Sequence, residues 1–329
     1  MQKINSMVRT IHSTDVALAV EEGFKKKPRR LPSWMFYDET GDKLFQAIMH
    51  MPEYYLTRCE YEILQTHKEK ILGHFISEGS SFQLAELGAG DGLKTEILLK
   101  GLSDQKVNFT YAPIDVSETA LALLRQRLNH SLPGLAIRPV NKKYEQALTE
   151  LNGEEERKVI LFMGANIGNF KPDEAIHFIS SVTASMHEND QLLVGFDLKK
   201  DPRVILSAYD DAQGITRDFN LNLLTRINRE LDANFQHDQF SHNPFYNPET
   251  GMTRSYLVSL SDQEVYIGAL NQTFSFHSWE VIHTEVSQKY DMAMIRELAA
   301  QAGLTIEDTF FDSRHYFCDV LFKKSGVND

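Results

Sequence analysis

The fold of this chain is decided by residues 83–95, which read QLAELGAGDGLKT. An apolar segment ends at Leu87, glycines follow at every second position, and a helical pattern continues from Leu93. Glycines permit a sharp turn and a close approach to a ligand, and the N–H groups of a helix N-terminus attract anions. The stretch therefore predicts a strand, turn and helix that bind a nucleotide-like cofactor, although G-x-G-x-G also occurs in structural turns.

An acidic residue strengthens the cofactor interpretation. The next apolar segment, residues 108–114, leads to Asp115, 27 residues after Gly88. An acid at the end of the second strand of such a unit can accept hydrogen bonds from both hydroxyls of a ribose. The dinucleotide fingerprint G-x-G-x-x-G is not matched, because Leu93 stands at its third glycine. A cofactor with a ribose but no pyrophosphate fits better, and we expect S-adenosyl-L-methionine (SAM).

Strand and helix patterns alternate through residues 61–198. We expect strands near 83–87, 108–114, 135–140, 158–164 and 191–196, and helices near 61–77, 93–102, 117–129 and 172–186. Apolar runs such as VILFM at 159–163 are typical of parallel strands covered on both faces. The prediction is an α/β fold with a Rossmann-like doubly wound sheet, as in class I SAM-dependent methyltransferases. The last strand of such a sheet would be antiparallel to the rest.

A second domain is predicted from the change of pattern after Asp197. Residues 199–235 look helical, and residues 236–250 are rich in Asn, His and Pro and are predicted to form a loop. Alternating segments at 255–260, 264–267 and 281–287 indicate an antiparallel sheet with one face in water. We expect residues 61–198 plus 288–329 to bind SAM, and residues 1–60 plus 199–287 to form an α+β substrate-binding domain.

Composition excludes several classes of partner. The formal net charge of −12 argues against nucleic acid or an anionic membrane surface. The basic run at 25–30 is interpreted as a solvated linker rather than a localisation signal. Two cysteines exclude a disulfide framework, and no apolar run approaches the roughly 20 residues that span a bilayer. We expect a cytoplasmic monomer that acts on a small molecule and needs no metal, since its histidines form no H-x-H or H-E-x-x-H motif.

Further motifs follow one another in a specific order. They are W-x-F-Y-D at 34–38, P-E-Y-Y-x-T-R at 52–58, E-L-G-x-G at 86–90, G-x-x-I-G-N at 164–169, A-Y-D-D at 208–211 and T-E-V-S at 284–287. Over residues 31–320 the chain resembles the L-histidine Nα-methyltransferases of ergothioneine biosynthesis. This resemblance implies SAM-dependent methylation of L-histidine to Nα,Nα,Nα-trimethylhistidine (hercynine), the first step of that pathway.

The resemblance also implies site residues. Its cofactor residues correspond to Gly88, Lys94, Asp115, Lys143 and Tyr144. Lys94 would pair with the methionine carboxylate of SAM or with a nearby acid, unless it is simply solvated. The family usually has an acidic residue at the position of Lys143, so the adenine amino group would lose an expected acceptor. Its substrate residues correspond to Tyr37, Phe45, Tyr54, Gly164, Asn169, Tyr209, Ser255, Glu285 and Ser287, of which Tyr54 and Asn169 are the candidate catalytic residues.

Glu285 and Ser287 carry the expected specificity for histidine. They are two residues apart on a predicted strand and therefore face the same side. A carboxylate and a hydroxyl can together take the two ring nitrogens of an imidazole, although both residue types are also ordinary on a strand face in water. Ser255 stands where well-known members of the family have methionine, so the sequence leaves open whether substrates other than histidine are accepted. The alternatives are N-methylation of tryptophan or a derivative, and a SAM-binding scaffold without catalysis.

Overall fold

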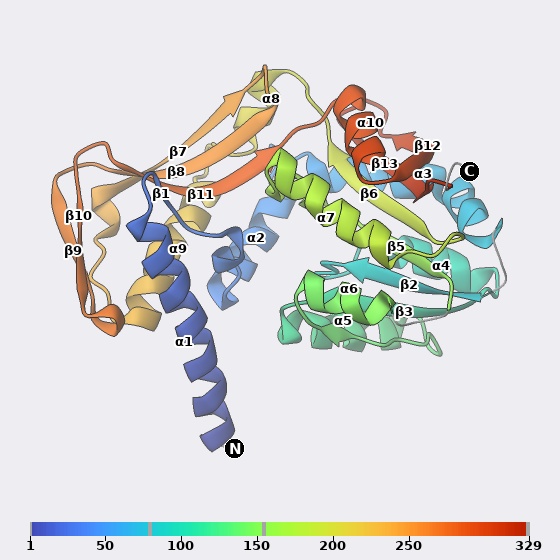
Figure 1. Ribbon diagram of the computed structural model, residues 1–329, viewed down its shortest axis with the longest axis horizontal. Coiled ribbons are helices and arrows are strands. Elements are labelled where there is room, and N and C mark those ends of the chain that lie inside the picture. Colours follow the sequence, from blue (N-terminus) through green and yellow to red (C-terminus); the bar gives the residue numbers. More distant parts are fainter. Residues whose placement is uncertain (1, 78–80, 153–155, 327–329) are drawn as a thin grey trace. The chain divides into compact units, whose positions relative to one another are not determined.

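The computed structural model describes residues 2–77, 81–152 and 156–326, which divide into two compact units (Figure 1). Unit 1 comprises Met1–Tyr55 and Lys200–Ser287, and unit 2 comprises Leu56–Lys199 and Gln288–Asp329. Each unit has its own buried apolar cluster. No helix in the described part of the chain has the length and apolar content needed to cross a membrane.

The core of unit 2 is a seven-stranded sheet in the order β12-β13-β6-β5-β2-β3-β4. The strands are β2 (Ser81–Leu87), β3 (Asn108–Asp115), β4 (Val140–Asn141), β5 (Lys158–Phe162), β6 (Gln191–Asp197), β12 (Leu304–Phe311) and β13 (Phe317–Lys324). Strands β2 to β6 pair in parallel, whereas β13 is antiparallel to β6 and β12. The predicted doubly wound sheet and its antiparallel last strand are confirmed.

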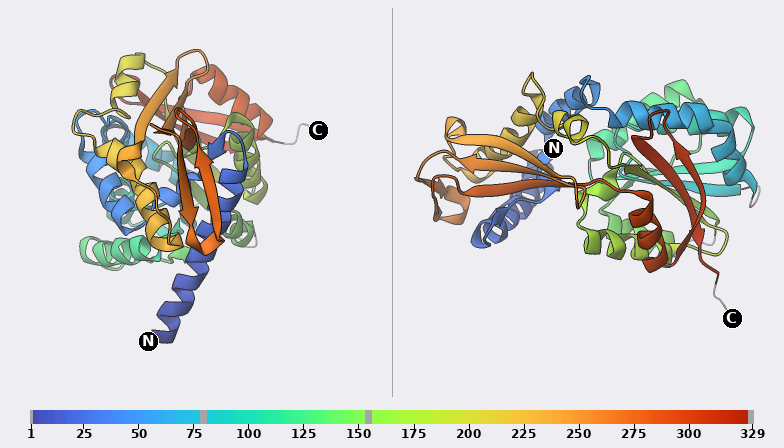
Figure 2. Two further views of the ribbon diagram at one scale, coloured as in Figure 1. Left: turned by 90° about the vertical axis from the view of Figure 1, so that its left-hand side faces the viewer. Right: turned by 90° about the horizontal axis from the view of Figure 1, so that it is seen from above.

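Helices cover the sheet of unit 2 because its strands are apolar on both faces. They are α3 (Leu56–Ser77), α4 (Thr95–Asp104), α5 (Glu118–Ser131), α6 (Tyr144–Asn152), α7 (Pro172–Ser185) and α10 (Met292–Gln301). Apolar side chains of α6, α7 and α10 join those of the central strands in one buried cluster. The right-hand view of Figure 2 shows α3 along one face of this sheet and α7 with α10 along the other.

Unit 1 combines a mainly antiparallel sheet with helices. Its sheet has the order β1-β11-β8-β7, from β1 (Arg29–Arg30), β11 (Val281–Gln288), β8 (Met252–Ser259) and β7 (Phe240–Asn247), and a separate hairpin pairs β9 (Gln263–Ile267) with β10 (Gln272–Phe276). Its helices are α1 (Gln2–Lys25), α2 (Glu39–His50), α8 (Pro202–Ser207) and α9 (Ile215–Leu231), with short 3-10 turns at η1 (Ser33–Phe36), η3 (His237–Gln239) and η4 (Gly268–Leu270). The middle of α9 is buried in the apolar cluster of this unit.

Two predictions about local structure were wrong, and one helix was missed. Residues 240–247, expected within a loop, form β7. Pro244 is tolerated there because β7 lies at the sheet edge, where a missing N–H breaks no ladder. The strand expected at 135–140 is reduced to an isolated bridge at Ile137 and the two residues of β4, since Pro139 interrupts the pairing. Helix α6 was not predicted.

The basic run at 25–30 is exposed as predicted except at Arg29, which is buried, and its end is not a linker. Its last two residues form β1, which pairs in parallel with β11. Arg29 is 5% exposed, lies 4.0 Å above the ring of Phe276, and forms an ion pair with Glu280. Apolar and cation–π packing therefore override the solvation that a run of charges usually indicates.

Candidate functional site

The glycine turn of unit 2 has the backbone geometry that its sequence requires. Gly88, Gly90 and Gly92 all adopt left-handed conformations, with φ of 74°, 52° and 63°. The N–H of Gly90 donates to Oδ2 of Asp115 at 3.0 Å. A Cβ atom at Gly90 would meet no heavy atom within 4 Å, so the turn borders open space there. The turn and the acid that the sequence singled out are thus in direct contact.

Asp115 has the acceptor capacity that a ribose needs. Its Oδ1 accepts the N–H of Ser117 at 2.9 Å, and its Oδ2 accepts Gly90. A carboxylate offers about four acceptor positions, so about two remain for the hydroxyls of a ribose. The side chain of Asn141, on the neighbouring strand β4, donates to the Asp115 carbonyl at 3.0 Å and ties the two strand ends together. The residues present therefore fit the ribose of SAM.

Tyr144 lies against the glycine turn, whereas Lys143 is exposed. The ring of Tyr144 packs edge-on against Phe162, with centroids 5.7 Å apart, and its hydroxyl lies 2.6 Å from where a Cβ of Gly88 would stand. Burial raises the pKa of this phenol, with Asp115 adding to the effect, so Tyr144 is a neutral group. Position 88 therefore requires glycine for two reasons: its positive φ, and the hydroxyl of Tyr144 that occupies the place of a Cβ atom.

Lys94 is paired with an acid rather than solvated. Its ammonium forms an ion pair with Glu60 of α3, whose side chain is only 1% exposed. Burial alone would lower the pKa of Lys94, but the carboxylate of Glu60 raises it above its ordinary value. The other oxygen of Glu60 accepts the N–H of Gly164 at 2.7 Å. Glu60 therefore joins a predicted cofactor residue to a predicted substrate residue.

The turn after β5 is strained at its start. Gly164 and the non-glycine Ala165 both adopt left-handed conformations, with φ of 76° and 56°. The side chain of Asn166 donates to the Met163 carbonyl at 2.9 Å and holds this shape. A 3-10 turn, η2 (Asn166–Asn169), follows and ends with the exposed side chain of Asn169. Strained backbone of this kind is concentrated at functional sites.

A second buried acid, Glu86, lies at the end of β2. Its two oxygens accept the hydroxyls of Thr95, at 2.6 Å, and of Tyr111. Burial raises the pKa of Glu86 to about 7, although both hydroxyl donors lower it. Glu86 thus fastens the first turn of α4 to β3 and changes charge near neutral pH.

In unit 1, three predicted substrate residues form one aromatic cluster around Phe219. The rings of Tyr37 and Phe45 are 5.8 Å apart, those of Phe45 and Tyr54 are 6.3 Å apart, and Phe219 of α9 lies 6.0 Å from Phe45. Three of these contacts, including that of Tyr37 with Phe219, are edge-on, the geometry that aromatic quadrupoles favour. Tyr37 is 42% exposed, so this cluster has one face open.

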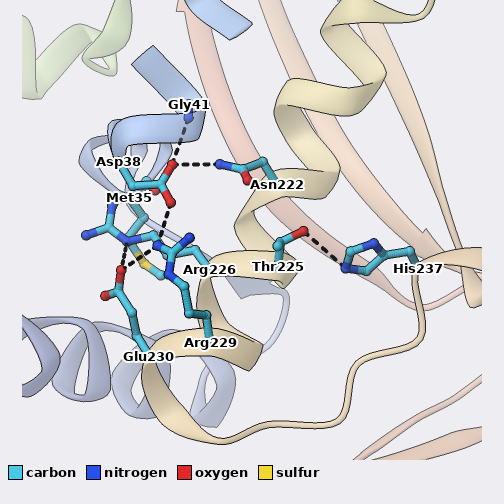
Figure 3. Close-up of polar contacts among 9 residues, drawn as sticks. All are labelled: Met35, Asp38, Gly41, Asn222, Thr225, Arg226, Arg229, Glu230 and His237. Carbon is cyan, nitrogen blue, oxygen red and sulfur yellow. Dashed lines mark hydrogen bonds and ion pairs between the residues drawn. The ribbon is translucent and has the colours of Figure 1, made fainter. Parts of the chain in front are cut away.

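Asp38, the last residue of the W-x-F-Y-D motif and the neighbour of Tyr37, connects the start of α2 to α9 (Figure 3). Its carboxylate caps α2 through the N–H of Gly41 at 2.7 Å and accepts the side-chain amide of Asn222 at 2.8 Å. Arg229 completes the network with an ion pair of 2.6 Å. Burial opposes the charge of Asp38, but Arg229, Gly41 and Asn222 together lower its pKa. The backbone beside Tyr37 is therefore anchored in a single position.

The other predicted substrate residues of unit 1 lie on the sheet and after α8. Glu285 of β11 is half-buried, and its Oε2 accepts the hydroxyl of the fully buried Ser255 of β8 at 3.2 Å. Ser287 and Tyr209 are both buried, with 7% and 6% exposure. Ser255 thus supplies a polar partner to the carboxylate that the sequence assigned to imidazole binding.

Sequence reasoning missed Glu60, Glu86, Asp38 and Phe219 as parts of these networks. Glu60 lies on the same helical face as the buried Cys59, Ile63 and Leu64, and an acid among apolar residues was the available signal. Asp38 and Glu86 stand inside quoted motifs, but their acceptor roles depend on donors far along the chain. No metal-binding group of three or more His, Cys, Asp or Glu residues occurs in the described ranges.

The sheet order of unit 2, its glycine turn and its ribose-type carboxylate define a class I SAM-dependent methyltransferase. A family model described as "Histidine-specific methyltransferase, SAM-dependent" matches residues 16–324. The chain belongs to this family.

Relatives of known function are similar over most of the chain. A histidine N-alpha-methyltransferase of Mycobacterium tuberculosis is 35% identical over 285 residues, which are 87% of each protein. Ergothioneine biosynthesis protein 1 of Schizosaccharomyces pombe is 29% identical over 91% of this chain but only 40% of its own length. A 4-dimethylallyltryptophan N-methyltransferase of Epichloe festucae var. lolii is 27% identical over 92% of both proteins.

Proposed function

We propose that this methyltransferase converts L-histidine to Nα,Nα,Nα-trimethylhistidine (hercynine), and that its product feeds ergothioneine biosynthesis. The observation that carries the choice of substrate is the half-buried carboxylate of Glu285, held by the hydroxyl of Ser255. A site built on such polar groups favours a ring that pairs with them and rejects rings that leave them unpaired. The similarity to a histidine N-alpha-methyltransferase supports the same choice.

In this proposal the two units have separate tasks. Unit 2 binds SAM, which supplies an electrophilic methyl group on a positively charged sulfur. Asp115 accepts the ribose hydroxyls, and the ammonium of Lys94 attracts the methionine carboxylate while it stays paired with Glu60. The adenine of SAM lies on the side of the glycine turn where Tyr144 packs. Lys143 cannot accept a hydrogen bond from the adenine amino group, so backbone carbonyl groups accept it instead.

A further set of residues holds the amino acid. Asn169 and the hydroxyls of Tyr54 and Tyr209 bind the α-amino and carboxylate groups, since an amide and a phenol can each donate and accept. Gly164, in the turn that leads to Asn169, also borders the substrate, and Tyr37 with Phe45 covers it. Glu285 accepts one ring N–H of the imidazole, and Ser287 pairs with the other ring nitrogen.

The chemistry needs little beyond this positioning. The free amine, whose pKa is about 8 for an α-amino group, is the nucleophile, and Tyr54 or water takes its proton. Alignment of nitrogen, methyl carbon and sulfur then contributes most of the acceleration. We further propose that the enzyme acts as a monomer in the cytoplasm, consistent with its two unpaired cysteines.

The experiment is incubation with SAM and an equimolar mixture of the twenty amino acids, followed by mass spectrometry. We expect histidine to gain the mass of one, two and finally three methyl groups. Methylation of tryptophan instead would favour the alternative substrate. Tryptophan is the alternative to test because the chain is also similar to a 4-dimethylallyltryptophan N-methyltransferase. Binding of SAM with no methylated amino acid at all would favour a scaffold.

A further inference from the structure

A buried carboxyl group, Asp319, lies beside the Glu60–Lys94 ion pair. Asp319 is on β13 and is 0% exposed, as is Glu60 on α3. Among the described residues neither oxygen of Asp319 has a hydrogen-bond partner, and the carboxyl group of Glu60 lies beside it, across Gly195. Two carboxylates cannot hydrogen-bond to each other unless a proton lies between them.

Gly195 of β6 leaves the space in which the two acids meet. A Cβ atom at this position would collide with Oε1 of Glu60 and would lie 3.1 Å from Oδ1 of Asp319. Gly195 has no positive φ, so its backbone does not require glycine. The absence of a side chain at Gly195 therefore makes room for the carboxyl pair and for the ring of Phe317.

The charges around this pair balance with one shared proton. Asp319 interacts with the charged groups Glu60 and Lys94 and with the thiol of Cys318, and Glu86 adds a further carboxyl near Lys94. With one proton on the pair, Glu60 and Asp319 together carry one negative charge against the one positive charge of Lys94. With none, the buried cluster would carry an unmatched negative charge, which is strongly unfavourable.

Lys94 depends on this arrangement because of its place in the chain. It is the N-cap of α4, where the helix dipole disfavours a cation. Glu60 compensates with one oxygen, while its other oxygen fixes Gly164 at the start of the strained turn. A carboxylate can serve both donors at once, whereas an amide has only one acceptor oxygen.

We propose that Glu60 and Asp319 share one proton and act as positioning residues, which hold Lys94 and the Gly164 turn in place for the cofactor and substrate. The inference rests on the proposed function only in taking Lys94 as a ligand of SAM. Burial and the carboxylate of Glu60 raise the pKa of Asp319 well above its ordinary value, in agreement with a retained proton. The proton also keeps the carboxylate of SAM from meeting excess negative charge.

The first test compares SAM affinity in Glu60→Gln and Asp319→Asn by calorimetric titration. Glu60→Gln leaves a donor facing either Lys94 or Gly164, so we expect affinity to fall about tenfold or more. Asp319→Asn preserves a neutral donor toward Glu60 and the same net charge, so we expect a loss of about threefold at most. Equal losses in both variants, or none in Glu60→Gln, would overturn the proposal.

A double-variant cycle separates positioning from general stability. If Glu60 acts through Lys94, adding Glu60→Gln to Lys94→Met should weaken SAM binding by less than about threefold beyond Lys94→Met alone. Full additivity would contradict the positioning role. Unchanged affinity in Lys94→Met alone would instead refute its assignment as a SAM ligand. Asp190→Asn is the matched control, because Asp190 is a buried partner of Lys158 and should alter stability without altering SAM affinity.

Infrared spectroscopy detects the shared proton directly. This experiment does not use the Glu60→Gln variant and so does not depend on whether that variant folds. Infrared difference spectroscopy of wild type minus Asp319→Asn at neutral pH should reveal the C=O stretch of a protonated carboxylic acid. Any protonated Glu86 contributes equally to both spectra and cancels. A difference spectrum with only carboxylate bands would show that Asp319 is ionised and would overturn the proposal.

Discussion

The two units assemble their predicted site residues in different ways. In unit 2 the cofactor residues follow the ends of neighbouring parallel strands, and Gly90 and Asp115 meet directly. In unit 1 the substrate residues come from remote parts of the chain, with Ser255 bonded to Glu285 and Phe45 packed on Phe219. A cofactor site can thus be recognised from one local motif, whereas substrate specificity depends on contacts between distant segments.

The units also differ in how they treat charge. Unit 2 neutralises buried charges internally, through the pair of Lys94 with Glu60 and through the raised pKa of Glu86. Unit 1 also contains ion pairs, of Arg29 with Glu280 and of Arg229 with Asp38, but the half-buried carboxylate of Glu285 accepts a neutral donor, the hydroxyl of Ser255. Cofactor-side changes should therefore affect SAM binding and pH dependence, and substrate-side changes should affect histidine alone.

The largest effect is expected from Asp115→Ala. If Asp115 binds the ribose as proposed, removing its carboxylate abolishes two charge-assisted hydrogen bonds, so SAM should bind at least about 100-fold more weakly. Calorimetric titration with SAM measures this directly. Affinity within about twofold of wild type would remove the ribose assignment.

Stability should depend on pH through Glu86. Because burial raises its pKa from 4.5 to about 7, the neutral form stabilises the fold fully below about pH 4.5, and this contribution is lost as pH rises to about 7. The loss corresponds to about 3 kcal/mol, which Glu86→Gln should remove. Urea unfolding of both proteins between pH 4.5 and 8 measures the difference. Parallel stability curves would contradict it, and Glu264→Gln on the exposed face of β9 is the control.

On the substrate side, Glu285→Ala should lower kcat/KM for histidine about 30-fold, equivalent to about 2 kcal/mol for a hydrogen bond to a charged group. SAM affinity should stay within about twofold of wild type. Steady-state kinetics with each substrate varied in turn test both statements. A parallel loss of SAM affinity would show that Glu285 does not act on the amino acid alone.

A smaller effect is expected from Asp38→Ala, which removes the cap of α2 and the tether to α9. Unfolding free energy should fall by about 1–2 kcal/mol, and KM for histidine should rise a few-fold as Tyr37 loses its anchor. Because its pKa is lowered in the fold, Asp38 stabilises above its unfolded-state pKa and less as pH falls.

The matched control for Asp38→Ala is Asp291→Ala, which removes the cap of α10 in unit 2. It should lower stability by a similar amount without changing KM for histidine. If both variants change KM equally, Asp38 has no particular role beside the aromatic cluster. Thermal unfolding and histidine kinetics distinguish these outcomes.

The smallest effect is expected from Ser255→Ala. One neutral hydrogen bond to Glu285 is lost, which should raise KM for histidine by about threefold. Ser241→Ala, at an exposed position of β7, should change nothing. A decrease in KM would instead indicate that the hydroxyl of Ser255 competes with the substrate for Glu285.

The sheet of unit 2 could be predicted because its signals are local. Strands β2, β3, β5 and β6 are continuous apolar runs, and the glycine turn follows the first of them. Strand β7 could not be predicted, because Pro244 and polar residues mimic a loop unless the strand is known to lie at an edge. Arg29 was misjudged because its aromatic partner, Phe276, is distant in sequence.

The same limit applies to the site. Asp115 was identifiable by its spacing from Gly88, and its contact with the glycine turn follows from parallel strand order. Glu60 and Asp319 were not identifiable, since α3 and β13 are separated by most of the chain and meet only in the folded sheet. Roles that depend on a tertiary partner have no local signal.

The most direct test of the account is the ratio of kcat/KM for L-histidine to that for L-tryptophan in the unmodified enzyme, measured with SAM at saturation. We expect a preference for histidine of at least about 100-fold, because an indole N–H can donate to Glu285 but the indole ring has no second nitrogen to pair with Ser287. Equal turnover of the two amino acids would contradict the assignment of Glu285 and Ser287 to an imidazole.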